Sequence, residues 1–190
     1  MRFEGGEMMR LYRQTVEDFG LYSGRELTAE EFTRLTEAAG KMSAKMRAVR
    51  IISASGVTKR ELEHRLVQKG EDAQNAKEAV AWLSEMDLLD DGKTAQNIVE
   101  RCIHKGYGIA RAKQALYEKR VPKHLWEEAL SDYPSQMSHI LSYLEDHPEI
   151  REDRKAKDRV IAALLRRGHS YGEIRRAMEE LSLQMEENDG

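Results

Sequence analysis

Two glycines one residue apart, Gly106 and Gly108, lie among basic residues in the stretch RCIHKGYGIARAKQAL. Glycine-rich loops bind phosphate through backbone amides at the start of a helix, so this stretch resembles a nucleotide site. A dinucleotide fingerprint also requires a preceding strand and a third glycine, but Arg111 occupies that third position and residues 98–105 have a helical pattern. We therefore interpret the stretch as a joint in which Gly106 ends one helix in the left-handed conformation and Gly108 precedes the next helix.

A second tripeptide, at residues 92–94, has the Gly-Lys-Thr sequence that closes a Walker A loop. That motif requires a glycine five residues earlier, and position 87 is Asp. A calcium-binding loop is excluded as well, because its third position would be Leu89. Asp90 and Asp91 instead suit the positive end of a helix that begins near residue 92.

Metal binding and catalysis have no supporting pattern. The six histidines include no pair four residues apart, and the single Cys102 excludes an internal disulfide and a multi-cysteine metal site. On a predicted helix, a lone cysteine is typical of a small core residue. We therefore predict no catalytic residue, no metal ligand and no cofactor, and we expect that the chain is not an enzyme.

The elements that position these residues are predicted to be helices. Charged residues make up 34% of the chain, hydrophobic residues 40%, and there are only 3 prolines, which favours helix over a β-rich fold. Residues 2–12 around Gly5-Gly6 predict a β-hairpin, and a capping box at Thr28–Glu31 predicts a helix that ends at Gly40. Further capping boxes lie at Thr58–Glu61 and Ser170–Glu173. The remaining predicted helices are 41–54, 58–69, 72–86, 92–105, 108–119, 122–131, 135–146, 152–167 and 170–184.

A repeat runs through these helices. A basic residue at a helix end recurs about every 50 residues, at Lys69, Lys119 and Arg167. A pair of apolar residues four apart, such as Leu62 and Leu66, precedes each end and another pair follows it, so each pair can face a core. A single unit buries little apolar surface, whereas stacked units share interfaces. We therefore predict an all-α fold of three tandem three-helix repeats, helix-turn-helix-like, in an elongated curved body with a short N-terminal β-hairpin and helix extension. The predicted boundaries are 1–40 for the extension, 41–88, 89–133 and 134–184 for the repeats, and 185–190 for an acidic tail.

Charged residues are unevenly distributed, although the net charge is only −3. Residues 71–100 hold eight acids and two bases, whereas residues 101–123 hold seven bases and one acid. Basic residues also recur on the second helix of every predicted repeat. For any one of them a solvated face is the alternative, but stacked repeats would align them in a stripe that can follow a polyanion or an acidic filament. The predicted partner-binding residues are Lys59, Arg60, Arg65, Lys69, Arg101, Lys105, Arg111, Lys113, Lys119, Arg120, Arg154, Lys157, Arg166, Arg167 and Arg175.

The chain has no apolar run that approaches the roughly 20 residues needed to cross a bilayer, and no signal-peptide pattern. We therefore expect a cytoplasmic protein without a membrane partner.

The motifs of the repeat resemble those of the RecX family of regulators of the RecA recombinase. The family pattern Glu-Leu-x-x-x-Leu-x-x-Lys-Gly matches residues 61–70, Leu-x-Asp-Asp matches residues 88–91, and Arg-Arg-Gly-aromatic matches residues 166–169. The resemblance covers nearly the whole chain. The departures are His169 in place of the usual Phe or Tyr, Arg120 where the family often has glycine, Val57-Thr58 in place of a more usual Arg-Ser, and an N-terminal extension shorter than the family's longer versions.

By this resemblance the chain is expected to be an all-helical regulator, without enzymatic activity, in homologous recombination, DNA repair and the SOS response. RecX proteins bind in the groove of the RecA–single-stranded-DNA filament, inhibit ATP hydrolysis and strand exchange, and promote filament disassembly. The expected partner is therefore that filament, with a weak direct contact to DNA, and the chain is expected to be a monomer.

Two other functions fit the helical pattern. Two short helices around a tight turn also describe a helix-turn-helix that binds duplex DNA directly. Such a module places Arg, Asn or Gln at the start of its recognition helix, and residues 122–124 and 170–172 match this poorly. The other alternative is a helical repeat scaffold for a different protein partner.

Overall fold

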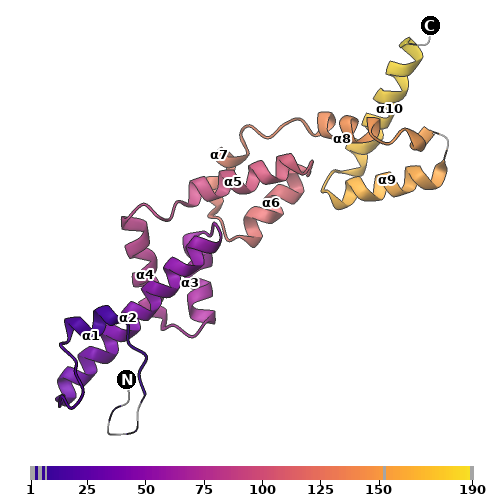
Figure 1. Ribbon diagram of the computed structural model, residues 1–190. Coiled ribbons are helices and arrows are strands. Elements are labelled where there is room, and N and C mark those ends of the chain that lie inside the picture. Colours follow the sequence, from indigo (N-terminus) through magenta and orange to yellow (C-terminus); the bar gives the residue numbers. More distant parts are fainter. Residues whose placement is uncertain (1–2, 4–5, 7, 152, 189–190) are drawn as a thin grey trace. The chain divides into compact units, whose positions relative to one another are not determined.

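The structure is a computed structural model that describes residues 3, 6, 8–151 and 153–188 (Figure 1). Every helix or strand element in this described part of the chain is a helix, which confirms the all-α prediction. The chain divides into two compact units, Met1–Asp90 and Asp91–Gly190. The predicted N-terminal β-hairpin falls mostly on residues 1–7, of which only 3 and 6 are described, and residues 8–12 form no strand.

The first unit contains four helices, α1 (Arg13–Asp18), α2 (Ala29–Ala54), α3 (Lys59–Gln68) and α4 (Ala73–Glu85). α3 and α4 both pack against α2. Their shared core consists of buried apolar residues from all three helices, from the joint between α2 and α3 and from the segment after α4. These are Ala44, Ala48, Ile51, Val57, Leu62, Leu66, Ala76, Ala79, Val80, Leu83 and Leu89.

α2 passes through Gly40 without a break, as one helix of 26 residues. The prediction that a helix ends at Gly40 and another begins at residue 41 was therefore wrong. A Cβ atom on Gly40 would lie 2.8 Å from Asn75 Nδ2 of α4. The end of the Asn75 side chain thus occupies the space beside Gly40, and glycine within α2 carries the usual cost of about 1 kcal/mol for a helix interior.

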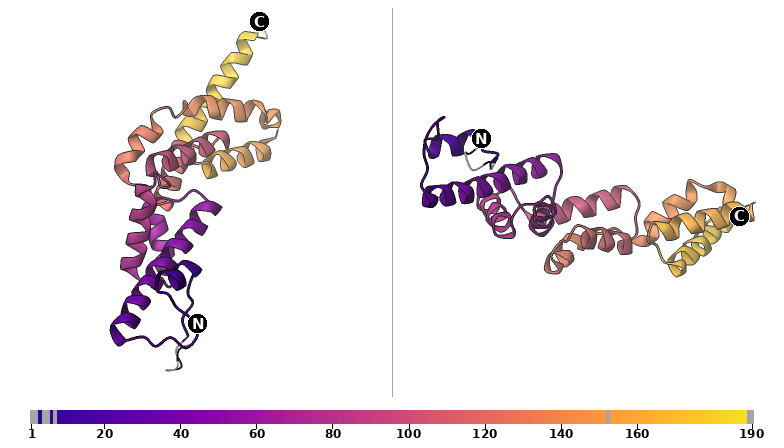
Figure 2. Two further views of the ribbon diagram at one scale, coloured as in Figure 1. Left: turned by 60° about the vertical axis from the view of Figure 1, so that its left-hand side comes forward. Right: turned by 90° about the horizontal axis from the view of Figure 1, so that it is seen from below.

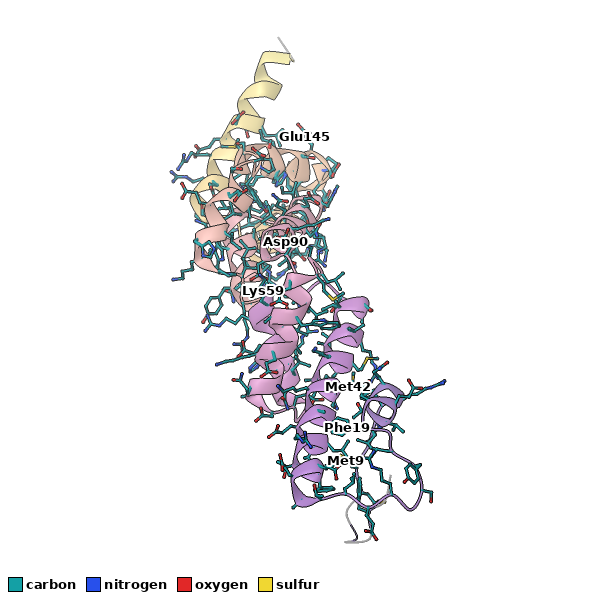
Figure 3. The ribbon with its side chains drawn as sticks, turned by 90° about the vertical axis from the view of Figure 1, so that its left-hand side faces the viewer. Met9, Phe19, Met42, Lys59, Asp90 and Glu145 are labelled. Carbon is teal, nitrogen blue, oxygen red and sulfur yellow. The ribbon has the colours of Figure 1, made fainter. Side chains whose placement is uncertain are left out.

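The segment between α1 and α2 is held by Arg25. Its guanidinium donates to the backbone carbonyl oxygen of Phe19 and pairs with the Glu31 carboxylate at 3.2 Å. In Figure 3 the labelled Met9 and Phe19 lie alongside α2. The N-terminal segment therefore packs on α2.

The second unit contains two groups of helices, each with its own core. Figure 2 shows α8, α9 and α10 gathered together, in agreement with their contacts. Most helices lie close to their predicted bounds, but α10 continues beyond the predicted end at residue 184. The elements of this unit are α5 (Asp91–His104), α6 (Ile109–Glu118), η1 (Lys123–Leu125), α7 (Trp126–Leu130), α8 (Gln136–Glu145), η2 (Pro148–Arg151), α9 (Arg154–Arg166) and α10 (Tyr171–Asn188).

The predicted capping residues do start their helices. The Thr28 hydroxyl accepts the Glu31 N–H at 3.1 Å, and the Glu31 carboxylate accepts the Thr28 N–H at 2.9 Å. Thr58 caps α3 through its hydroxyl, and Ser170 forms a reciprocal pair with Glu173 ahead of α10. Each bond satisfies an amide at a helix start that has no partner within the helix.

Five helices in the described part of the chain end in the same left-handed turn, in which the amide after the turn donates to the carbonyl five residues earlier. The bond from Val121 N–H to Leu116 O at 3.0 Å is one example. Glycine suits this turn because it has no Cβ to clash. The residues in the left-handed conformation are Gly70 (φ 87°), Asp87 (φ 55°), Gly106 (φ 61°), Arg120 (φ 55°) and Gly168 (φ 89°).

Among the described residues, the helices are all too short or too polar to cross a membrane.

Candidate functional site

The backbone of the Gly-x-Gly stretch is fully engaged, which excludes a phosphate cradle. Gly106 N–H and Tyr107 N–H close the end of α5 by bonding to Ile103 O at 2.9 Å and Cys102 O at 3.0 Å. The next two amides bond to groups from later in the chain, Gly108 N–H to Arg167 O at 2.8 Å and Ile109 N–H to Gln136 Oε1 at 3.0 Å. A phosphate site needs such amides free, so the interpretation as a joint holds.

This joint interlocks with the one between α9 and α10. Gly108 has an ordinary φ of −73°, so the chain does not need glycine there for the turn. A Cβ atom on Gly108 would lie 2.5 Å from the carbonyl carbon of Gly168 and closer still to its oxygen. A Cβ atom on Gly168 would in turn lie 2.7 Å from Arg111 Cβ. The two glycines therefore let two stretches of backbone touch. Gly106 ends α5 in the left-handed conformation and Gly108 precedes α6, as predicted, but the contact of Gly108 with Gly168 was not foreseen.

Side chains complete the interlock. The His169 ring lies 3.1 Å from Gly106 O through Nε2, and the Tyr133 hydroxyl donates to Tyr107 O at 2.7 Å. Tyr133 in turn packs edge-on against His139, with ring centroids 6.4 Å apart. Burial raises the pKa of Tyr133 to about 12. The carbonyls of Gly106 and Tyr107 thus each have a partner from residues that follow α7 in the sequence.

Basic residues surround the α5 end of this interlock. Burial raises the pKa of the Cys102 thiol, while Lys105, Arg101 and Arg111 each act to lower it. The charges of α5, of the joint after it and of α6 therefore act on one buried thiol. Because Arg111 also contacts the backbone of Gly168, the interlock brings the start of α6 next to the end of α9.

The predicted partner-binding residues differ in how available they are. Arg65 pairs with the buried Glu61 at 2.5 Å, and the Arg167 guanidinium stacks on the Tyr143 ring at 4.2 Å. Arg175 pairs with Glu179 at 3.5 Å. Lys119 and Arg120 are half-buried. The other predicted residues are exposed, namely Lys59, Arg60, Lys69, Arg101, Lys105, Arg111, Lys113, Arg154, Lys157 and Arg166.

The cations fall into two sets, because Lys59, Arg60, Arg65 and Lys69 belong to the first compact unit and the others to the second. Within the second unit, the interlock places α6 and the end of α9 together. A single stripe along all three predicted repeats stays a prediction.

Sequence reasoning missed the residues that join the two groups of helices in the second unit. Tyr133 and Gln136 reach the joint from 26 and 27 residues away, so no local pattern marks them. His169 was noted only as a departure from the family pattern. Sequence reasoning also missed a groove of about 240 Å³ between α9 and α10. Its lining includes Lys157, Ile161, Tyr171, Arg175 and Met178.

Comparison with known proteins gives a consistent set of relatives, although no protein-family model matches the chain. "Regulatory protein RecX" of Vibrio parahaemolyticus serotype O3:K6 is 27% identical over 140 residues, which cover 72% of this chain and 90% of that protein. "Regulatory protein RecX" of Streptococcus mutans serotype c is 24% identical over 188 residues, which cover 97% of this chain and 73% of that protein.

Two solved structures share the fold. A crystal structure of regulatory protein RecX aligns with a TM-score of 0.66 and 18% identity, over 94% of this chain and 91% of that chain. The crystal structure of RecX from Lactobacillus salivarius aligns with a TM-score of 0.65 and 23% identity, over 77% of this chain and 99% of that chain.

Proposed function

Because this chain belongs to the RecX family, we propose that it binds the RecA–single-stranded-DNA filament and inhibits the ATPase and recombinase activities of RecA. It acts in this proposal as a cytoplasmic, non-enzymatic and monomeric regulator of recombination and DNA repair. Its surface contacts RecA protomers, with at most a weak direct contact to DNA.

The proposal includes the three-repeat arrangement. α2–α4, α5–α7 and α8–α10 each enclose a separate core. The second helices of the three groups, α3, α6 and α9, each end at a basic residue followed by a left-handed turn, at Lys69, Lys119 and Arg167. Repeated units in one chain can contact successive protomers of a filament, whereas a single globular partner offers only one copy of each surface.

The observation that carries the proposal is the recurrence of exposed cations on the second helix of each group. Lys69 follows α3, Lys113 lies on α6 and Lys157 lies on α9, and all three are exposed. These side chains are available to acidic groups of a partner, whereas Arg65 and Arg167 are held by contacts inside the chain. In this proposal Arg65 and Arg167 therefore stabilise the helices that carry the binding surface and do not contact the partner themselves.

A chain bound across several protomers would inhibit by holding them in one arrangement. ATP-driven enzymes pass through several conformations in each cycle, and a ligand that binds one of them more tightly shifts the population toward it. No catalytic group is needed for this effect.

The proposal is tested by binding to RecA filaments on single-stranded DNA. The triple variant Lys69→Glu, Lys113→Glu, Lys157→Glu should bind at least about tenfold more weakly, since each exposed ion pair contributes about 0.2–1 kcal/mol and reversal adds repulsion. The matched control reverses three exposed cations outside the predicted set, Lys77, Lys123 and Arg176. Equal affinity of the two triple variants, with both still helical by circular dichroism, would overturn the assignment of the surface.

The same proteins should also be titrated on duplex DNA without RecA. We expect weak, sequence-independent binding that disappears as salt is raised. Tight and sequence-selective binding to duplex DNA would instead support the helix-turn-helix alternative.

A further inference from the structure

We propose that His169 is a pH-dependent latch, which in its neutral form holds the α5–α6 joint against the α9–α10 joint and releases it when it takes up a proton. The latch concerns the free protein. Its consequence for partner binding rests on the proposed function, because it fixes the basic residues of α6 relative to those of α9.

The hydrogen bonding of His169 identifies which form the closed joint accepts. The residue is only 3% exposed, and its Nε2 lies 3.1 Å from Gly106 O. A carbonyl oxygen only accepts, so Nε2 carries the hydrogen and, in the neutral ring, Nδ1 is a bare acceptor. Nδ1 is buried and has no hydrogen-bond partner among the described residues. A proton added at Nδ1 would place a charged donor in a buried position without an acceptor, which is unfavourable.

The groups that face His169 come from every element packed around it. His139 of α8 has a buried Nδ1 that also lacks a partner among the described residues. Arg167 precedes the α9–α10 joint, and Glu173 of α10 is already engaged by Ser170. On the side of the α5–α6 joint, Arg111 lies against the backbone of Gly168. Among these groups Glu173 is the only anion, so the surroundings disfavour a positive charge on His169.

The direction of the titration follows from these contacts. Burial lowers the pKa of His169 below its ordinary value of 6.5, and His139 and Arg167 act in the same direction. The hydrogen bond to Gly106 and the charge of Glu173 oppose the shift without reversing it. An opened joint, in which the ring reaches solvent, takes up a proton at the ordinary pKa. The closed joint is therefore fully favoured above about pH 6.5 and loses stability as the pH falls toward the lowered pKa.

Release of His169 would free the whole interlock, because its neighbours bridge the same two joints. Gly168 contacts Arg111, and the carbonyl of Arg167 accepts the Gly108 amide at 2.8 Å. When the joint opens, the exposed cations of α6 and α9 are no longer fixed in one arrangement. The basic surface of the second unit is thus preorganised at neutral pH and loses this preorganisation in mild acid.

The latch is tested on the full chain without any partner. Nuclear magnetic resonance follows the imidazole shifts of His169, and hydrogen exchange follows the Gly108 amide, each between pH 7.5 and 5.5. We expect His169 to titrate below its ordinary pKa of 6.5, and Gly108 protection, corrected for intrinsic exchange, to fall about tenfold per unit of pKa difference. A pKa of His169 at or above 6.5 would overturn the proposal.

Two variants separate the latch from general acid sensitivity. His169→Phe keeps an aromatic ring and removes the titration, so Gly108 protection should no longer depend on pH beyond intrinsic exchange. His64→Phe changes an exposed histidine of the first unit and should keep the wild-type response. If His169→Phe retains the acid-induced loss of protection, the latch is wrong. The titration of wild-type His169 decides the matter if that variant does not fold.

Filament binding provides the second arm. Wild-type affinity for RecA filaments should fall more steeply between pH 7.5 and 5.5 than that of His169→Phe. If the latch titrates as expected but the two affinities fall in parallel, His169 does not position the binding surface and the inference fails in that part. If neither protein binds filaments at any pH, the proposed function fails while the latch in the free protein stands.

Discussion

Replacing Gly108 by Ala tests the interlock of the two joints directly. The new methyl group would lie 2.5 Å from the carbonyl carbon of Gly168 and 2.9 Å from the amide nitrogen of His169, and these are backbone atoms that cannot rotate away. If the joints stay together, the overpacking costs about 1–3 kcal/mol. If they separate, the bonds from Gly108 to Arg167 and from His169 to Gly106 are lost, at about 1 kcal/mol each.

One effect opposes this loss. At a φ of −73° alanine fits the backbone, and the substitution restricts the unfolded chain, which gains about 0.4–1 kcal/mol. Gly108→Ala should therefore lower the free energy of unfolding by about 1–2 kcal/mol, measured by urea denaturation. Amide exchange should show reduced protection at residues 106–109.

Gly172→Ala is the matched control. Gly172 lies in the first turn of α10 in the same unit, and a Cβ atom there meets nothing within 4 Å. This variant should gain about 0.5–1 kcal/mol, because alanine is the better helix former. Equal stability of the two variants, with unchanged protection at the joint, would refute the close contact between the glycines.

Three further predictions concern stability. Arg120 is left-handed with φ 55°, so Arg120→Gly should raise the free energy of unfolding by about 1 kcal/mol relative to Arg120→Ala in urea, and equal stability of the two would contradict strain at this turn. Arg65→Ala removes the ion pair of the buried Glu61 and should cost about 1–3 kcal/mol by thermal denaturation, whereas Arg65→Ala combined with Glu61→Gln should recover part of this loss. The pKa of Tyr133 is raised to about 12, so its contribution to stability is complete below pH 10 and is lost as the pH rises toward 12. Tyr133→Phe should weaken this loss of stability at alkaline pH, measured by denaturation between about pH 10 and 12. If the variant loses stability as steeply as the wild type, another group causes the loss.

The helical pattern, the capping residues and the apolar faces could be predicted because each depends on neighbours in sequence. Leu66, Leu116 and Leu164, which mark the repeat, are all fully buried. Such positions depend on local periodicity, which a single sequence displays directly.

The roles of individual glycines could not be predicted, because they depend on contacts between distant segments. Gly40 was expected to end a helix and instead lies inside α2 beside the Asn75 side chain, while Gly108 meets Gly168 across sixty residues of sequence. A glycine in a turn and a glycine in a close backbone contact look the same in the sequence. Likewise His169 is conspicuous as a substitution, but only the structure shows that Gly106 is its partner.

The availability of cations was also invisible in the sequence. Arg167 occupies the same position at its helix end as the exposed Lys69, and Arg65 lies one turn before Lys69. Their partners are Glu61, which is buried, and Tyr143, which lies on a different helix. A charge pattern therefore predicts a basic surface but does not separate the residues that bind a partner from those that stabilise the chain.

The most direct test of the proposed function is the rate of ATP hydrolysis by RecA on single-stranded DNA as this protein is added at ratios below one per protomer. We predict that the rate falls with added wild-type protein and falls much less with the variant carrying Lys69→Glu, Lys113→Glu and Lys157→Glu. An unchanged rate at an equimolar ratio, with the added protein still helical by circular dichroism, would contradict the proposal that this chain regulates RecA.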